Sequence, residues 1–297
     1  MGFRRRLIIC KLFVFCLVTS FGLAQTPDVF RLEYMLMPRN GAGAKLSRIK
    51  LVANMPIKVR DSNNIVIGAE YNRLTYDLQS DEITIGEAEG LNYLHVIDLN
   101  LGYTFKLNKN WRAGIQFNPR IASTLTQSLT SDDYFINGGV FFINNRKKDT
   151  NLEHPFILVL GLTYNATTGL PFPLPFISYN REINESWSYN AGIPKSNIKY
   201  TFNEKSNVQA FVGLDGYMAH LQESPTVNGQ NSEYISLSVV VGGVGYEYCF
   251  TKHLVAYMYT GYTFRLNNVL RNKNRDEVYK LDDVNAFYLR TGLKFKI

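Results

Sequence analysis

Histidine is the side chain best suited to proton transfer and metal binding near neutral pH, and this chain contains four. They are His95, His154, His220 and His253. None of them has a second histidine or a cysteine at the separation that is typical of metal ligands. We therefore expect no metal site and no cofactor.

A hydrolase with a serine nucleophile needs a histidine beside that serine and an Asp or Asn that orients the histidine. The Gly-x-Ser-x-Gly turn does not occur, and nothing in the sequence brings a serine and a histidine together. Phosphate-binding loops are also missing, since the glycine-rich segment 242–245 lies inside an apolar stretch. We expect that the protein is not an enzyme, with a membrane-embedded lipid hydrolase as the third-ranked alternative.

Charged residues at alternate positions of apolar stretches are a stronger signal. In the stretch 111–125, Ile115 and Phe117 fall on one side, whereas Arg112 and Arg120 fall on the other. A β-strand presents successive residues to opposite faces. The stretch therefore predicts a strand with one apolar face and one polar face.

About fourteen such stretches follow one another, rich in Tyr, Phe, Val, Ile and Thr as strands are. Alternating strands in this number are typical of an all-β fold, a transmembrane up-and-down antiparallel β-barrel with lipid outside and polar residues inside. Twelve strands are the alternative, if a hairpin is lost near 146–153 or near 194–195. The expected strands are 28–37, 45–59, 64–78, 93–106, 110–127, 133–145, 154–166, 173–182, 186–193, 196–204, 207–222, 233–250, 252–265 and 284–297.

The connections between these strands support a barrel. Tight connections rich in turn-forming residues alternate with longer ones, such as 79–92, 222–232 and 266–283. Barrels of the bacterial outer membrane have short periplasmic turns and longer outer loops. This rhythm predicts an even number of strands, with both termini in the periplasm.

In such a barrel, charged residues opposite the lipid-facing set would line the lumen, because Arg or Lys facing lipid at the midplane costs about 2–4 kcal/mol. They could form the wall of a pore for small solutes, with a slight preference for anions. They could instead form a ladder of opposed charges that closes the lumen. The candidate lumen-lining residues are Arg31, Glu33, Arg48, Lys50, Lys58, Glu70, Asp98, Arg112, Arg120, Asp215, Glu247, Arg290 and Lys294.

The first 24 residues have the pattern of a cleaved secretory signal peptide. A basic region that ends at Lys11 precedes the apolar run 12–23, and Ala24 supplies a small residue before the cleavage site. Its removal lowers the formal charge from +7 to +3, because four basic and no acidic residues leave. The near-balanced chain 25–297 is expected to be one barrel domain that does not bind nucleic acid. Only Cys249 remains, so no disulfide is expected within the mature chain.

The last stretch, 284–297, alternates up to its final residue. Outer-membrane barrels commonly end on an amphipathic strand that the barrel-assembly machinery recognises. We therefore expect this machinery and outer-membrane lipid as partners.

One segment is more specific than the alternation. Three prolines spaced by two remove amide donors from one side of the backbone, which a strand tolerates only at an edge, a bulge or its start. They predict the entry into a strand near residue 173. The motif residues are Gly169-Leu170-Pro171-Phe172-Pro173-Leu174-Pro175-Phe176-Ile177-Ser178-Tyr179, Trp187-Ser188-Tyr189, Gly192-Ile193-Pro194-Lys195-Ser196 and Phe30-Arg31-Leu32-Glu33-Tyr34.

With these motifs, the chain resembles a family of uncharacterised outer-membrane β-barrel proteins of Gram-negative bacteria, filed as a domain of unknown function. The resemblance covers roughly residues 28–297. It implies a fold and a location, and it transfers no catalytic or binding residue. The leading functional expectation is passive passage of small solutes through the lumen. The alternative is a closed barrel with a structural or surface-docking role.

Overall fold

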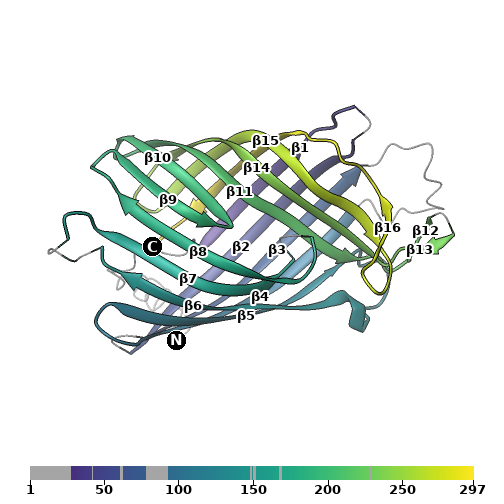
Figure 1. Cartoon of the computed structure of the whole chain (residues 1–297), viewed down its shortest axis with the longest axis horizontal. Coiled ribbons are helices and arrows are strands. Elements are labelled where there is room, and N and C mark those ends of the chain that lie inside the picture. Colours follow the sequence, from purple (N-terminus) through teal and green to yellow (C-terminus); the bar gives the residue numbers. More distant parts are fainter. Residues whose placement is uncertain are drawn as a thin grey trace, which may run out of the picture.

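The computed structural model describes residues 28–41, 43–60, 63–77, 93–147, 149, 152–166, 169–227 and 229–297. The predicted signal peptide and the predicted loop 79–92 lie outside these residues. The described chain forms a closed antiparallel barrel of fourteen strands, drawn in Figure 1. Among the described residues, no helix is long and apolar enough to cross a membrane.

The barrel strands follow the predicted stretches closely because the period-two pattern is strong in each of them. Both doubtful hairpins are present, so the count is fourteen and not twelve. The strands are β1 (Phe30–Met37), β2 (Lys45–Arg60), β3 (Asn63–Asp77), β4 (Tyr93–Lys106), β5 (Trp111–Ser123), β6 (Tyr134–Asn145), β7 (Phe156–Asn165), β8 (Phe172–Glu182), β9 (Trp187–Ile193), β10 (Lys195–Asn203), β11 (Ser206–His220), β14 (Tyr234–Cys249), β15 (Leu254–Arg271) and β17 (Phe287–Phe295).

Each barrel strand pairs with its neighbours along the chain, and β17 pairs with β1 to close the ring. The start of β1 pairs with the end of β17, as Phe30 with Phe295, so both described ends lie at the end with the tight turns. We call this the inner end, and the opposite end is the outer end. Short elements occupy the outer connections. They are η2 (Ser131–Asp133), β12 (Thr226–Val227), β13 (Gln230–Asn231) and β16 (Glu277–Lys280).

Two strand ends differ from the predicted ones by four residues or more. Strand β15 continues to Arg271, beyond the predicted end at residue 265, because it pairs with β14 along its whole length and with β16 at its end. Strand β5 stops at Ser123, before the predicted 127, where its backbone reaches β11. Both differences arise from pairing between segments that alternation within one strand does not reveal.

The contact between β5 and β11 is unusual because these strands are not neighbours along the chain. The hairpin of β9 and β10 ends at Lys195, which pairs with Gly213, so the rest of β11 has no β10 partner. His220 at the end of β11 pairs in parallel with Ser123, and the Thr124 amide donates to the His220 carbonyl at 3.2 Å. The outer ends of β5 and β11 are thereby joined.

The outer end of β6 and the connection after β7 both contact β14. The ring of Phe135 on β6 lies edge-on against Tyr234 on β14. The Ser236 hydroxyl donates to the carbonyl of Gly169, in the connection between β7 and β8. Both Ser236 and its neighbour Met218 are completely buried.

The prolines of β8 lie on a free edge of the sheet, as the sequence predicted. Pro173 and Pro175 pair with β7, but the pairing of β8 with β9 begins only at Ile177. The Thr163 hydroxyl donates to the carbonyl of Leu174, which therefore points to the β7 side. The missing proline amides would point to the other side, where β9 does not reach.

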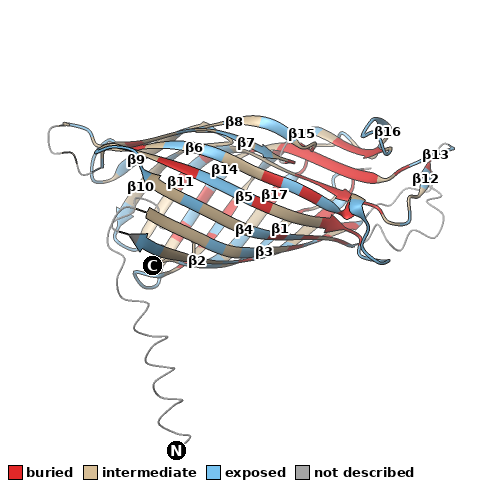
Figure 2. Cartoon of the chain, turned by 90° about the horizontal axis from the view of Figure 1, so that it is seen from below, coloured by how far each residue is buried: buried red, intermediate tan, exposed pale blue. Residues whose placement is uncertain are grey.

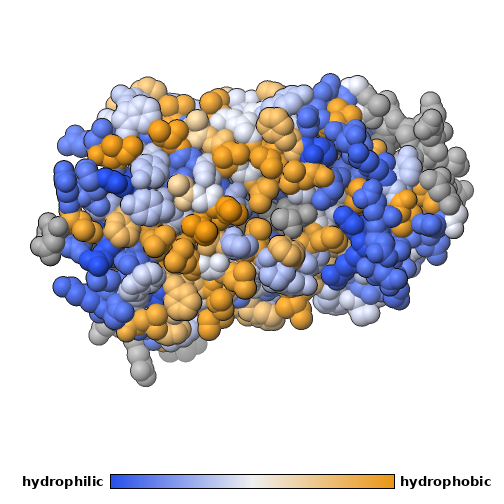
Figure 3. Space-filling model, in the orientation of Figure 1, coloured by the Kyte–Doolittle hydropathy of each residue, from blue (hydrophilic) through white to orange (hydrophobic). Residues whose placement is uncertain are grey.

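An apolar belt lies between two polar ends on the face of the barrel that Figure 3 shows. Its exposed aliphatic residues include Leu51, Ile115, Val140 and Leu162, all on outward faces. Exposed aromatic residues flank the belt on both sides. Those near the inner end include Phe30, Tyr103, Trp187, Phe202, Tyr246 and Phe295, and those near the outer end include Tyr34, Tyr93, Tyr134, Tyr164, Phe172, Tyr262 and Phe287.

Candidate functional site: the lumen

The charged residues predicted to line the lumen all lie on inward faces. In an antiparallel pair, directly opposed residues share a face. Glu33 is opposite Lys50, and Glu70 is opposite Asp98, which is itself opposite Arg120. These five residues therefore share one face of the sheet, the face that alternation within each strand assigns to the lumen.

Every acidic residue of this set is ion-paired with a basic one. The pairs make a layer of opposed charges within the lumen, as the closed-barrel interpretation expects. They are Lys50–Glu70 at 2.6 Å, Arg120–Asp98 at 2.7 Å, Lys294–Glu247 at 2.5 Å, Arg290–Glu33 at 3.9 Å and Arg48–Asp215 at 3.0 Å.

The pair of Arg48 and Asp215 crosses the lumen. Arg48 is on β2 and Asp215 is on β11, and β1, β17, β15 and β14 separate these strands around the ring. Two hydrogen bonds of 3.0 and 3.1 Å form a bidentate contact, and the same guanidinium lies 3.4 Å from Glu33. The Arg48 side chain is only 11% exposed. The charged layer thus spans the lumen instead of only coating its wall.

Two tyrosines that were not predicted complete this layer. The hydroxyl of Tyr257 donates to Glu33 at 2.7 Å, and that of Tyr259 donates to Glu247. Both rings turn inward and lie against glycines of adjacent strands, Gly292 and Gly245. Residues on both faces of β15 are apolar or aromatic here, as in Tyr257-Met258-Tyr259, so sequence alternation could not separate these inward tyrosines from outward ones.

We expect substitution of Gly245 to displace Tyr259 from Glu247. A Cβ at this position would lie 1.7 Å from the Tyr259 ring, so a Gly245→Val side chain cannot be accommodated without moving the ring. Overpacking of this kind costs about 1–3 kcal/mol. Urea unfolding in lipid vesicles measures the loss. Gly242→Val is the matched control, because nothing lies within 4 Å of its Cβ position; an equal loss in both variants would contradict the proposed contact.

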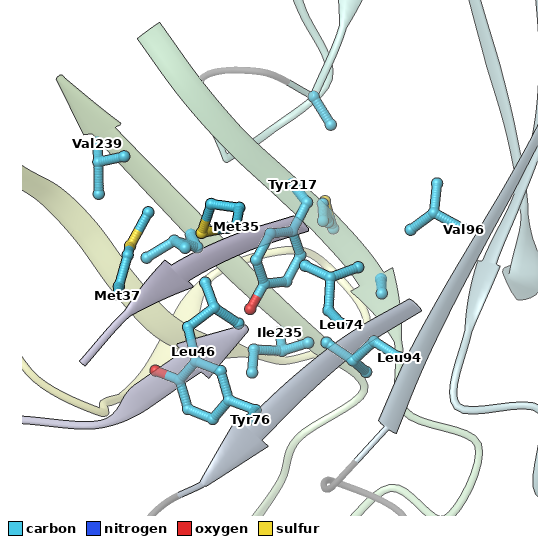
Figure 4. Packing of buried hydrophobic residues seen from close by; sticks show 14 of the residues in the cluster. Met35, Met37, Leu46, Leu74, Tyr76, Leu94, Val96, Tyr217, Ile235 and Val239 are labelled. Atoms are coloured by element: carbon cyan, nitrogen blue, oxygen red, sulfur yellow. The ribbon is translucent and has the colours of Figure 1, made fainter. Parts of the chain in front are cut away.

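The outer part of the lumen is apolar, which corrects the expectation of a polar inward face along whole strands. Figure 2 shows that buried segments gather toward the outer end, and Figure 4 shows the packed side chains. This outer core was missed because the apolar side of a strand can face the lumen there, as at Ile235 and Leu237, which alternate with Ser236 and Ser238. Its members, each at most 5% exposed, include Met35, Met37, Leu46, Leu74, Tyr76, Leu94, Val96, Tyr217, Ile235, Leu237, Val239, Leu270 and Tyr288.

A cavity of about 420 Å³ lies on the inner side of the charged layer, against β1 to β6. Its polar wall includes Arg31, Asn54, Glu70, Asn100 and Gln116. The amide of Asn100 contacts Asn54 at 3.4 Å, so part of this polar wall is already hydrogen-bonded within itself. The lumen thus contains, from the inner to the outer end, a polar cavity, a layer of ion pairs and an apolar core.

Lys195 is a further lumen residue that was assigned to a connection from the sequence. It opens β10 opposite Gly213, and its ammonium lies 5.4 and 5.3 Å from the ring centres of Phe211 and Tyr259. A cation over two aromatic faces is electrostatically favourable. The signal that could have identified it is the alternation of β10, extended by one residue.

At the outer end, His220 lies 2.8 Å from the buried carboxylate of Asp133 through its Nδ1 atom. The hydroxyl of Ser123 also bonds to Asp133, and the amide of Thr130 donates to it at 2.7 Å. Burial alone would raise the pKa of Asp133, but the hydrogen bonds that it accepts outweigh burial and hold this pKa at about 2. Since the serine bonds to the carboxylate and not to the histidine, these residues do not form a catalytic triad.

Comparison with known proteins gives a family and a set of distant barrels. Residues 38–296 match the model of a family described as a domain of unknown function (DUF6268). No curated protein sequence matches the chain.

Similar solved structures include the NanC porin (TM-score 0.40, 12% identity, covering 90% of this chain and 100% of that one) and the KdgM porin (0.40, 9%, 90% and 98%). They also include LpxR from Salmonella typhimurium (0.41, 6%, 90% and 99%). Similarity at this level carries no argument about function.

Proposed function

The chain belongs to the family described as a domain of unknown function (DUF6268), and on this premise we propose that it is an integral outer-membrane β-barrel that is closed to passive diffusion and acts through its outer surface. Its role is then structural or one of surface docking, and it has no enzymatic activity. This is the alternative to the pore that the sequence first favoured.

The outer surface of the barrel supports the membrane part of the proposal. A continuous apolar belt with aromatic residues on both sides matches the hydrocarbon core and the two interfaces of a bilayer. The inner end then faces the periplasm. Export by a cleaved signal peptide, and assembly guided by the amphipathic strand β17, belong to the same proposal.

One observation supports a closed lumen: the inward side chains of the outer core are almost completely buried. A water-filled channel would expose the inward side chains along its whole length, yet Leu94, Ile235 and Leu270 are completely buried. The contact between Arg48 and Asp215 adds a polar bridge below this core. Solutes that enter the cavity from the inner end would meet both barriers.

We expect no stepwise ion conductance when the mature protein is inserted into planar bilayers. The measurement needs proof of insertion, which heat-modifiable gel mobility of the reconstituted protein supplies, and a known porin as a positive control. Stepwise conductance of the wild-type protein, at a rate that scales with the inserted amount, would overturn the closed-barrel proposal in favour of a pore.

A further inference from the structure

Three potential metal ligands from separate parts of the chain meet beside the contact of β5 with β11. They are Asp132 in η2, His220 at the end of β11, and Glu233 just before β14. A ring nitrogen of His220 and a carboxylate oxygen from each of the other two lie within 4.8 Å of one another. Sequence spacing could not reveal this cluster, because 88 and 13 residues separate its members.

The state of His220 points to a ligand. The side chain is 8% exposed, and its Nδ1 atom bonds to Asp133, which is fully buried. The carboxylate thus occupies Nδ1, which leaves Nε2 as the ring nitrogen that can bind a ligand. A buried imidazole whose Nδ1–H donates to a carboxylate presents an Nε2 lone pair, which is the second-shell arrangement of metal-bound histidines.

The charges around the cluster also favour a cation. Asp132, Asp133 and Glu233 bring three carboxylates close to the imidazole ring of His220. On the facing elements, Arg275 interacts electrostatically with Tyr234, and Arg271 donates a hydrogen bond to the carbonyl of Arg275. The basic groups therefore offset only part of the negative charge, and a bound divalent ion would offset the rest.

We propose that Asp132, His220 and Glu233 bind a divalent transition-metal ion. One imidazole nitrogen with two carboxylates is a donor set that suits zinc, whereas calcium and magnesium prefer oxygen alone. Three protein ligands leave a position open for water or for a donor from a partner. Because the ligands come from the β5–β6 connection, β11 and the β11–β14 connection, the ion would hold together the segments that close the outer end.

Zinc titration of the full mature chain, folded in detergent and stripped with EDTA, tests this site. We expect one zinc ion per chain by isothermal titration calorimetry, and a higher Tm when zinc is added. Glu233→Gln and Asp132→Asn should each weaken zinc binding by about 10-fold or more, because each removes one of three ligands. His220→Gln should abolish it.

His154→Gln is the matched control, since His154 lies beside Glu153 in a half-exposed connection and should keep full zinc binding. Gel mobility without heating verifies that each variant is folded; if His220→Gln does not fold, Glu233→Gln decides. Wild-type protein that binds no zinc, or a folded Glu233→Gln that binds as tightly as wild type, overturns the proposal. Conductance is a separate measurement, so failure of this site leaves the closed-barrel proposal to its own test.

Discussion

Arg48→Met is expected to destabilise the barrel by about 3–5 kcal/mol, because it leaves buried carboxylates without their partner. Asp215 would lose its bidentate contact, and Glu33 would lose one of two cations. Urea unfolding in lipid vesicles, followed by the fluorescence of Trp111 and Trp187, measures the change.

The double variant Arg48→Met/Asp215→Leu should recover most of this loss, since a buried ion pair replaced by apolar groups is often neutral. The control is Lys147→Met, which breaks the exposed pair of Lys147 with Glu182, formed at 2.7 Å by half-exposed side chains. It should cost no more than about 1 kcal/mol. Equal effects of Arg48→Met and Lys147→Met would show that the cross-lumen contact is not desolvated.

Leu74→Ala is expected to cost about 2–5 kcal/mol, because it opens a void within the outer core. Leu74 is 1% exposed and lies among inward side chains of several strands, as Figure 4 shows. The same unfolding assay measures the loss.

Leu162→Ala is the matched control for this prediction, since Leu162 lies on the outward face and is 49% exposed. Lipid can fill the space that it leaves. The substitution then costs only the free energy of transferring the lost methyl groups, with no added cost for a cavity. The difference between the two variants therefore reports the cavity. If Leu74→Ala cost no more than Leu162→Ala, the outer lumen would be wet and the closed-barrel proposal would weaken.

Much of the fold could be predicted from the sequence because alternation acts within single strands. It assigns the charged residues of each strand to one face, and the register pairs several of them with one another on that face, as with Asp98 and Arg120. The family resemblance is confirmed by the match over residues 38–296. The alternation and the proline spacing are local patterns, because each depends only on residues one or two positions apart in the sequence.

The contents of the lumen could not be predicted in the same way. Where the apolar side of a strand faces the lumen, as at Leu237 between Ser236 and Ser238, alternation cannot distinguish a lipid-facing side chain from a packed one. The partners Arg48 and Asp215 are distant in sequence and meet only because opposite walls approach each other. The meeting of Asp132, His220 and Glu233 likewise depends on the contact of β5 with β11.

That contact changes the perimeter of the barrel along its axis. Fourteen strands surround the inner end, but where β5 meets β11 the strands β6 to β10 drop out, which leaves nine to encircle the lumen. Barrel width grows with strand number, and about eight strands enclose a space that side chains fill. The molecule is therefore a funnel, wide enough for a cavity at one end and narrow enough to pack solid at the other. Opening the narrow end would require the wall itself to widen, because no separate plug is present among the described residues.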